Sequence, residues 1–455
     1  MNTIVIKQLL NRESTRHAIT LGLGTVLGHL AVTIASPIWS RLYEPADFGR
    51  YGLMISYLST ATAAISLRYD LAIPSARNSE ESVRLVVLSL FCAIPVSLLA
   101  GGIFVWFTRQ GFLGFGRLPS WSTAFVILSL ALTSIYSTLR FWHVRNSEFG
   151  AISVSLVSQG IGRAITPIAL APLKFGWFGL ITGELLGRAL GIRKLAKPVL
   201  PLVRDIFKST SMRDFGDLLR QYRQYPLVFL PSSVLDAASA VIALPVVVSL
   251  FGVSVGGEFL LAQQIVMAPS ALISGTLRDI IHSKLIRHAG DNPADLPKLV
   301  KRTALRLFLF SSAIYLPLAC LAPVLTSSIF GQSWLRVGAF VATLCPAAIV
   351  SVAVSPISRA MVFSRIPHIK FAADFAKLLL PVAGMVICAR LSSGSVISGL
   401  IGYAVMTAVA YAFYFAIVVF SIRINNQLSN GKSQPRTNEI PIDPRHITAK
   451  QIILP

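Results

Sequence analysis

Long apolar stretches follow one another along the chain, and they constrain its fold more than any other feature. A helix that rises about 1.5 Å per residue needs roughly 20 apolar residues to cross about 30 Å of hydrocarbon. Only 13% of the residues are charged, whereas roughly 25% are charged in a typical soluble domain. We therefore predict an all-α polytopic membrane protein. Its transmembrane helices, about twelve, are predicted at residues 18–39, 51–74, 85–107, 121–142, 150–172, 175–192, 226–250, 256–278, 307–326, 336–358, 371–390 and 395–421.

The formal net charge of +22 would also suit a nucleic-acid-binding protein. The distribution of Lys and Arg argues against that class, because most of them fall in the N-terminal tail, in alternate gaps between the apolar stretches and in the C-terminal tail. By the positive-inside rule, both termini and these gaps are predicted to be cytoplasmic. The basic gaps are also expected to attract anionic membrane lipids. The few basic residues predicted on the opposite side are Arg41, Arg50, Arg109, Arg117, Lys174, Arg336 and Arg390.

A basic segment divides the predicted spans six and six, which predicts two lobes joined by a cytoplasmic connector. The C-terminal tail is polar and is predicted to be disordered, because it cannot bury much apolar surface. Apolar residues recur at helical spacing in the connector and predict an amphipathic helix on the inner membrane face; these are Phe215, Leu218, Leu219 and Tyr222. The predicted parts are an N-terminal lobe (1–192), the connector (193–225), a C-terminal lobe (226–424) and the tail (425–455).

A weak internal repeat supports two related lobes. When the chain is shifted against itself, Leu42-Tyr43 aligns with Leu250-Phe251, and Gly49 aligns with Gly257. In both places an apolar stretch ends, a short turn follows, and the next stretch begins. Repeated halves are common in transporters, where the substrate site lies at the interface between them. Chance similarity between two apolar hairpins is the alternative.

The sixth predicted span combines glycines with two charged residues. Glycine recurs at every fourth position, and such a ridge predicts that this helix packs closely against a neighbour. Glu184 and Arg188 are four residues apart on the same helix, so we predict that they form an ion pair, with ion coupling by Glu184 as the alternative. The glycines of the ridge are Gly179, Gly183, Gly187 and Gly191.

Arg163 lies near the middle of the fifth predicted span, and Gln159 and Thr166 share its helix face. Ionisable residues at membrane depth cost roughly 2.5 to 3.5 kcal/mol on insertion scales, so they usually face a cavity or a partner. This pattern favours an anion site in a water-filled cavity. The alternative is that Arg163 is neutralised by an acidic group from another helix.

Two further cations, Arg68 and Lys377, lie near the ends of their predicted spans. Each either contacts a substrate or extends its side chain to the membrane interface. Asp70 and Asp374 lie close to them in sequence and are candidates for pairing or ion coupling.

Asp236 lies in the seventh predicted span between Pro231 and Pro245 and has no cationic residue nearby in sequence. A proline-distorted helix frees backbone carbonyls for use in a cavity. Two roles are open for Asp236: coupling to an ion or proton, and pairing with Arg163 across the lobes.

No metal or cofactor site is predicted. The 7 histidines form no clustered ligand set, the 4 cysteines lie inside predicted spans, and there is no glycine-rich phosphate-binding loop. The longest predicted external loop, residues 108–120, contains no Asp or Glu. This disfavours a membrane enzyme that works with paired acids, so we predict that the chain is not an enzyme.

Four segments resemble the Wzx-type bacterial polysaccharide biosynthesis proteins, which are flippases of lipid-linked oligosaccharides. The turn SRLYEPADFGRYG between the first two predicted spans carries the resemblance most clearly. In the third segment, Tyr225 replaces the Phe that is typical of this family. Together the segments extend the resemblance over nearly the whole chain except its C-terminal tail. They are residues 40–52, 66–73, 222–227 and 257–264.

The resemblance implies membership in the multidrug, oligosaccharidyl-lipid and polysaccharide exporter superfamily, with two six-helix lobes around a central cavity. It also implies a transporter of the bacterial inner membrane that moves an undecaprenyl-pyrophosphate-linked sugar repeat unit by alternating access, for O-antigen, capsule or exopolysaccharide synthesis. A pyrophosphate needs cationic donors and sugars need polar groups. The polysaccharide polymerase or export machinery is an expected partner. The expected contacts are Arg163, Arg68 and Lys377 for the pyrophosphate, and Gln159, Gln263 and Gln264 for the sugars.

Two other functions remain open. A drug or cation antiporter of the same superfamily needs acidic groups in its cavity, and Asp236 keeps this function in consideration. A membrane-embedded polysaccharide polymerase is disfavoured because the predicted external loops are short.

Overall fold

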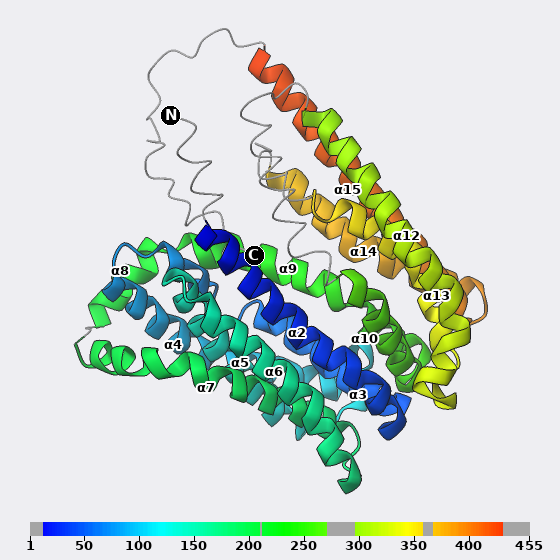
Figure 1. The fold of residues 1–455 in the computed structure, drawn as a ribbon, viewed down its shortest axis with the longest axis horizontal. Coiled ribbons are helices and arrows are strands. Elements are labelled where there is room, and N and C mark those ends of the chain that lie inside the picture. The colour runs from blue at the N-terminus through cyan, green and yellow to red at the C-terminus, as the bar shows by residue number, and fades with distance from the viewer. Residues whose placement is uncertain (1–11, 210–211, 271–295, 358–366, 431–455) are drawn as a thin grey trace. The chain divides into compact units, whose positions relative to one another are not determined.

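The computed structural model describes residues 12–209, 212–270, 296–357 and 367–430 (Figure 1). Over these residues the chain forms helices joined by short turns and contains no β-strand, so the predicted all-α class is confirmed. The chain divides into two compact units, with the boundary between Ala238 and Ser239. The described part of the connector therefore belongs to the first unit, which we call unit 1; unit 2 begins at Ser239.

Unit 1 is a set of long helices packed along their sides. α6 packs against both α2 and α7, and α5 packs against both α4 and α7. α4 ends at Gly111, whose φ of +65° suits a residue without a side chain. The elements are α2 (Arg12–Leu42), α3 (Pro45–Thr62), η1 (Tyr69–Ser75), α4 (Ser79–Gln110), η2 (Phe112–Arg117), α5 (Ser122–Arg145), α6 (Phe149–Leu170), η3 (Ala171–Leu173), α7 (Trp177–Ser209), α8 (Met212–Gln221), the π-helix η4 (Tyr225–Phe229) and α9 (Leu230–Val241), whose last residues belong to unit 2.

Unit 2 repeats this side-by-side packing. α14 packs against α15, and α13 packs against both α12 and α15. The elements are α10 (Ala243–Phe251), a helix over residues 253–270, α12 (Leu296–Phe330), η6 (Gln332–Trp334), α13 (Val337–Val354), α14 (Pro367–Leu391) and α15 (Val396–Asn430).

Seven helices of the described ranges are long and apolar enough to cross a membrane, and η4 and α9 together with α10 make an eighth span if this bent pair counts as one. This pair is bent by 44°. The bend has a local cause, because Pro245 has no N–H to donate to the carbonyl of Val241 one turn earlier. The seven helices cover residues 19–42, 79–110, 122–145, 149–173, 296–330, 332–354 and 396–422.

The other four predicted spans depart from the simple apolar helix. The span predicted at 51–74 is α3 followed by a turn and η1, because the α-helix ends at Thr62. The spans predicted at 175–192 and 371–390 lie in α7 and α14, which carry ionisable residues. The span predicted at 256–278 is helical to residue 270, and its remainder lies outside the described residues.

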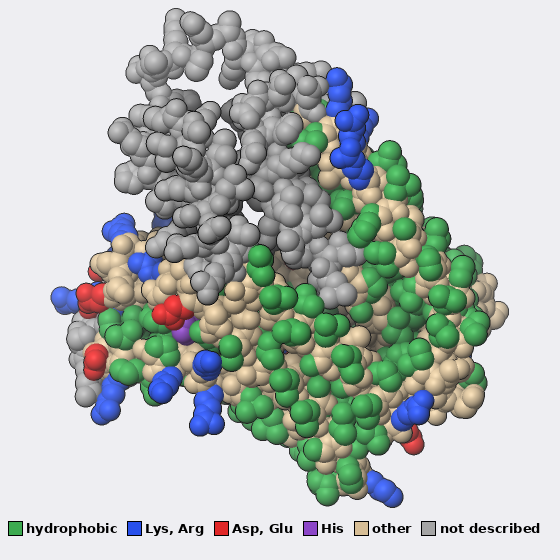
Figure 2. Space-filling view, in the orientation of Figure 1, with side chains coloured by type: hydrophobic (Ala, Val, Ile, Leu, Met, Phe, Trp, Pro, Cys, Tyr) green, Lys and Arg blue, Asp and Glu red, His purple; other side chains and the backbone are tan. Residues whose placement is uncertain are grey.

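Hydrophobic side chains cover much of the visible face of the long helices, and Lys and Arg side chains gather near α8 (Figure 2). Large apolar residues are widely exposed along these helices; Ile34 and Val324, for example, are each 70% exposed. An exposed apolar surface of this extent is expected where hydrocarbon, rather than water, surrounds the helices.

Three of the four ridge glycines of α7 pack against α6, and the fourth, Gly179, lies against the hydroxyl of Tyr43. The close packing predicted from the glycine spacing is therefore confirmed. An added Cβ at Gly183 would lie 2.8 Å from the ring of Pro167, and one at Gly187 would lie 2.5 Å from Cγ of Arg163. A Cβ at Gly191 would collide with the side chain of Gln159. Successive glycines toward the C-terminus of α7 therefore contact residues of α6 spaced four apart toward its N-terminus. These contacts fix the register of the two helices.

α7 does not end with the predicted span at residue 192 but continues to Ser209. Leu195 and Val199 on this extension are fully buried in an apolar cluster. Their burial stabilises the helix beyond residue 192. The buried His143, at the end of α5, lies against the same turn. Its Nε2 is 3.0 Å from the carbonyl oxygen of Leu195, and its Nδ1 is 2.6 Å from Oε2 of Glu148.

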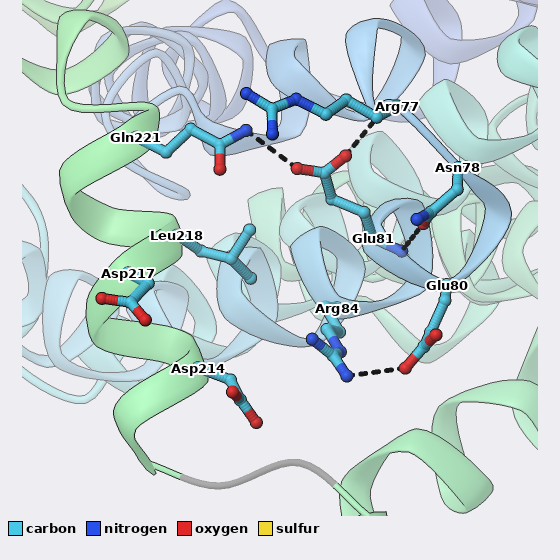
Figure 3. A pocket seen from close by; sticks show the side chains of 9 residues that line it. All are labelled: Arg77, Asn78, Glu80, Glu81, Arg84, Asp214, Asp217, Leu218 and Gln221. Atoms are coloured by element: carbon cyan, nitrogen blue, oxygen red, sulfur yellow. Dashed lines mark hydrogen bonds and ion pairs between the residues drawn. The ribbon is translucent and has the colours of Figure 1, made fainter.

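α8 lies where the sequence predicts an amphipathic helix. It buries Leu218 and is held against the start of α4 by Glu81 (Figure 3). Oε1 of Glu81 accepts hydrogen bonds from Gln221 (2.9 Å) and from the hydroxyl of Tyr222 (3.2 Å). Burial and the nearby Glu81 carboxylate raise the pKa of Tyr222 to about 12, so the phenol stays protonated and donates this bond.

A pocket of about 250 Å³ opens between α4 and α8 (Figure 3). Its lining combines carboxylates and guanidiniums, and it contains none of the sequence-predicted site residues. The lining residues are Arg77, Asn78, Glu80, Glu81, Arg84, Asp214, Asp217, Leu218 and Gln221.

The last described helix, α15, extends to Asn430. Residues 425–430, which the sequence assigns to the polar tail, are therefore helical. Residues 431–455 lie outside the described residues, so the predicted disorder of the tail stays a prediction.

Replacing Gly187 by Ala is expected to lower stability by about 1–3 kcal/mol, because the new methyl group must push α7 away from Arg163. The melting temperature of the purified protein measures this. Gly102→Ala is the matched control, since Gly102 also lies in a helix and an added Cβ there meets nothing within 4 Å. That change should leave the melting temperature unchanged or raise it. Equal effects of both changes would contradict the packing role of Gly187.

Candidate functional site

Three charged side chains meet in unit 1 where α6 packs against α7. Glu184 is only 4% exposed, and its Oε2 lies 2.7 Å from Nε of Arg163. Its Oε1 lies 2.9 Å from Arg188, so the predicted pair of Glu184 and Arg188 is confirmed. We call this group the Glu184 cluster. Two guanidiniums and one carboxylate leave it with a formal net charge of +1.

Two hydroxyl groups complete the cluster. Nη1 of Arg188 donates to Oγ1 of Thr133 on α5 at 2.7 Å. The buried Tyr51 on α3 lies close enough to both Arg163 and Glu184 to interact with them electrostatically. The cluster therefore joins four helices of unit 1 through buried polar contacts, which are stronger at low dielectric than in water.

Arg163 is the most accessible member of the cluster, with 35% of its side chain exposed against 4% for Glu184. Its stem crosses α7 at Gly187, and the absence of a side chain there lets the guanidinium reach the carboxylate. Of the two interpretations from sequence, the structure shows the acidic partner on another helix. Gln159, one turn earlier on α6, packs against Gly191 and lies 3.4 Å from Oγ of Ser155.

A second polar group, the Asp70 cluster, comprises Arg68, Asp70, Ser137 and Asp236. Asp70 is 2% exposed, and its Oδ2 accepts a 2.6 Å hydrogen bond from Ser137 on α5. Its Oδ1 and Nε of Arg68 have no hydrogen-bond partner in the described part of the chain. Arg68 interacts electrostatically with both Asp70 and Asp236. Asp236 thus lies within electrostatic range of Arg68, and its ion-coupling role stays a prediction.

The backbone that carries Arg68 is strained. Leu67 and Arg68 have φ values of +49° and +66°, in the left-handed region that side chains disfavour. Such conformations cost of order 1–3 kcal/mol each and gather at functional sites. The turn explains why the predicted span at 51–74 is not one helix, and it holds Arg68 between α3 and η1.

In unit 2, Lys377 on α14 lies between a carboxylate and an aromatic ring. Its Nζ is 2.9 Å from Oδ1 of Asp374 and 4.8 Å from the centre of the Tyr414 ring on α15. Both charged side chains are largely buried. The structure therefore pairs Lys377 with Asp374 within the helix layer. Gln263 and Gln264 are half-buried on the helix over residues 253–270.

Sequence reasoning missed the hydroxyl partners Tyr51, Thr133 and Ser137. A signal existed for the last two, because Thr133 and Ser137 are spaced one helical turn apart on α5. It also missed the ion pair of Glu258 and Arg336 in unit 2, whose Oε2 and Nε are 3.0 Å apart. No local pattern links those two residues, which are far apart in sequence.

In the described ranges, no three His, Cys, Asp or Glu side chains come together in a metal-binding arrangement.

Replacing Ser137 by Ala is expected to lower stability by about 1–3 kcal/mol, because it leaves the buried carboxylate of Asp70 without its hydrogen-bond donor. Chemical or thermal unfolding of the purified protein measures the change. The control is Ser158→Ala, since Ser158 is only half-buried and its hydroxyl donates an exposed hydrogen bond to Val154 of its own helix. A Ser137 variant as stable as this control would show that Asp70 does not depend on the bond.

Comparisons with known proteins are consistent with these features. The family model for polysaccharide biosynthesis proteins matches residues 38–339. No curated protein sequence matches the chain. Among solved structures, the chain is similar to a multidrug resistance MATE family transporter of the MOP superfamily in its inward-facing conformation. The TM-score is 0.65 at 17% sequence identity, and the alignment covers 90% of this chain and 99% of that one.

Two further structures share the fold. An outward-facing MATE family transporter of the MOP superfamily gives a TM-score of 0.59 at 18% identity, over 92% of this chain and 98% of that one. A MOP superfamily transporter from Pyrococcus furiosus, whose reversed binding-pocket polarity suggests a different function, gives a TM-score of 0.56 at 15% identity with the same coverage. The chain therefore belongs to the family of polysaccharide biosynthesis proteins and has the fold of MOP superfamily transporters.

Proposed function

We propose that this protein is a flippase that moves an undecaprenyl-pyrophosphate-linked oligosaccharide across the bacterial inner membrane by alternating access, for surface polysaccharide synthesis. In this proposal both termini are cytoplasmic, and the polymerase or export machinery takes the product. Membership in the polysaccharide biosynthesis family supports a role in surface polysaccharide synthesis, and the fold shared with MOP superfamily transporters supports a transport function. The observation that carries the substrate class is the net positive Glu184 cluster within apolar helices.

The chemistry of Arg163 suits a pyrophosphate. A guanidinium presents several N–H donors in one plane and binds phosphate oxygens in pairs. Glu184 contacts Nε of Arg163, and about a third of the Arg163 side chain is exposed. An anionic headgroup can therefore approach Arg163 from the side away from the carboxylate. The Glu184 cluster has a net charge of +1 to attract it.

The remaining cations support the same substrate class. Arg68 is held by a strained turn and keeps an unused Nε donor among the described residues. Lys377 supplies an ammonium in unit 2. The apolar polyprenyl chain needs no protein site, since it remains in the hydrocarbon, while half-buried amides such as Gln263 and Gln264 are available to sugar hydroxyls.

The charges disfavour a drug or cation antiporter. A cationic substrate needs a carboxylate that is not already neutralised, yet each candidate acid lies beside a cation: Glu184 beside two arginines, Asp374 beside Lys377, and Asp70 and Asp236 beside Arg68. As in the Pyrococcus furiosus relative, the polarity of the binding groups is the property that we expect to separate the functions.

Proteoliposomes with a fluorescent undecaprenyl-pyrophosphate-linked oligosaccharide test the proposal through the accessibility of the label in each leaflet. Arg163→Ala is expected to reduce protein-dependent transfer at least about tenfold, because a charge-assisted hydrogen bond contributes about 1.5–3 kcal/mol. Arg50→Ala is the control, since Arg50 is exposed and lies 3.6 Å from Asp47 rather than in the Glu184 cluster. Wild-type protein that leaves this lipid untransferred but exports a cationic dye would instead establish an antiporter.

A further inference from the structure

One face of α5 carries polar side chains at helical spacing, and it contacts both polar clusters of unit 1. Oγ1 of Thr133 accepts a 2.7 Å hydrogen bond from Arg188 of the Glu184 cluster, and Ser137 donates a 2.6 Å hydrogen bond to Asp70. Because Thr133 and Ser137 are one turn apart, α5 places contacts to the two clusters about 6 Å apart along its axis. We call this the α5 polar face. Its residues, spaced i, i+3, i+4 and i+7, are Thr133, Tyr136, Ser137 and Arg140.

The α5 polar face ends in Arg140, which lies about 4.5 Å beyond Ser137 along the helix axis. Cζ of Arg140 is 5.8 Å from the centre of the buried Phe141 ring. Its Nε is buried and has no hydrogen-bond partner, and no carboxylate pairs with its guanidinium, among the residues that the structure describes. Arg140 therefore carries a positive charge that this part of the chain does not compensate, near the predicted inner end of its span.

A second unsatisfied guanidinium donor lies at the same end of unit 1. Nε of Arg68 is also buried and without a hydrogen-bond partner in the described ranges, and the turn that holds Arg68 is strained. Asp70 follows two residues later and contacts Ser137, which lies one turn before Arg140. The spans predicted at 51–74 and 121–142 thus bring two arginines, each with an unsatisfied Nε donor, to the predicted inner end of unit 1.

We propose that Arg140 and Arg68 form an entry site for the phosphate groups of the lipid-linked substrate, from which the headgroup passes along α5 toward Arg163. This inference rests on the proposed function and adds a first binding step and a binding residue, Arg140. The distance is short, because Thr133, which contacts the Glu184 cluster, lies about 10 Å from Arg140 along the helix. The hydroxyl of Tyr136 is buried without a partner among the described residues and supplies a further donor to the anion.

The charges at the entry site favour an anion. A buried N–H without a partner is costly, and a phosphate oxygen that accepts from it forms a charge-assisted hydrogen bond. Arg68 has Asp70 and Asp236 within electrostatic range, whereas Arg140 forms no ion pair with any described residue. Arg140 is also only half-buried, so an anion can reach it. Arg140 therefore provides most of the attraction.

The alternative role of Arg140 is to extend its charge to the membrane interface, as long cationic side chains near span ends do. The buried Nε and the nearby Phe141 ring argue against this role, because they hold part of the guanidinium within the helix layer. A lysine would reach the interface equally well, but its ammonium lacks the planar fork that binds phosphate oxygens in pairs. Arg140→Lys therefore separates the two roles.

The experiment measures the Kd of inorganic pyrophosphate and of farnesyl pyrophosphate, by calorimetry on the full chain in phosphatidylcholine nanodiscs. Arg140→Gln is expected to weaken binding about tenfold, and Arg140→Lys at least about threefold, because each loses charge-assisted hydrogen bonds. Tyr136→Phe should weaken binding about threefold and leave the melting temperature unchanged, since its hydroxyl has no partner among the described residues. Arg193→Gln is the control, because Arg193 is an exposed cation of α7 on the same predicted side of the membrane.

The proteoliposome assay tests the entry step itself. Arg140→Gln is expected to raise the substrate concentration for half-maximal transfer about tenfold and to leave the maximal rate unchanged, because an entry site acts on capture rather than on passage. The phosphate of a membrane lipid has the same chemistry, so the binding measurement is repeated in nanodiscs that contain phosphatidylglycerol. Wild-type affinity for farnesyl pyrophosphate that falls there to the level of Arg140→Gln would assign the site to membrane lipid and overturn the inference.

Wild-type affinity in Arg140→Gln and Tyr136→Phe, or full recovery of affinity in Arg140→Lys, also overturns the inference. If Arg140→Gln does not fold, Tyr136→Phe alone decides, because it removes only a hydroxyl without a partner in the described part of the chain. Normal transfer of the lipid-linked sugar by the wild type and by all these variants would refute the entry site and leave the proposed function intact. Absence of both binding and transfer in the wild type would refute both.

Discussion

A carboxylate cannot remain buried among membrane helices without compensation, and the compensation of Glu184 organises much of unit 1. Its two oxygens hold one guanidinium from α6 and one from its own helix. Those arginines in turn contact Tyr51 on α3 and Thr133 on α5. The glycine ridge of α7 is the packing counterpart of this ionic contact, because the stem of Arg163 reaches Glu184 only where Gly187 leaves room. The ion pair between Arg163 and Glu184 and the close packing of α6 against α7 therefore depend on each other.

The apolar stretches and the glycine spacing predict the helical class, most spans and the contact face of α7, because lipid imposes length and apolarity directly on the sequence. The four spans that depart from the simple pattern contain or adjoin several candidate site residues: Arg68 follows α3, Glu184 lies in α7, Lys377 lies in α14, and Gln263 and Gln264 lie on residues 253–270. Arg163 and Gln159 lie instead in α6, which is long and apolar enough to count as a simple span. Polar groups in a membrane helix weaken its apolar signal, so the sequence predicts α6 more clearly than α7 and α14.

The partners of the charged residues were harder to predict than the residues themselves. The pair of Glu184 and Arg188 follows from helical spacing, but the contact of Arg163 with Glu184 joins two helices and depends on their register. The strained turn at Leu67 and Arg68 has no glycine to indicate it. The extension of α7 beyond the predicted span depends on tertiary burial of Leu195 rather than on a local signal. Each of these features arises from packing between elements that are distant in sequence.

The length of α7 has a mechanical consequence. Glu184 and Leu195 belong to one uninterrupted helix with no proline between them, about 16 Å apart along its axis. At the second of these points the carbonyl of Leu195 contacts His143, and through that imidazole the helix is tied to Glu148 at the start of α6. A continuous helix without a kink moves along its axis as one body, so a displacement at Glu184 also displaces Leu195. Any rearrangement of the ionic contacts at Glu184 that shifts α7 therefore also moves the contacts of His143 at the junction of α5 and α6.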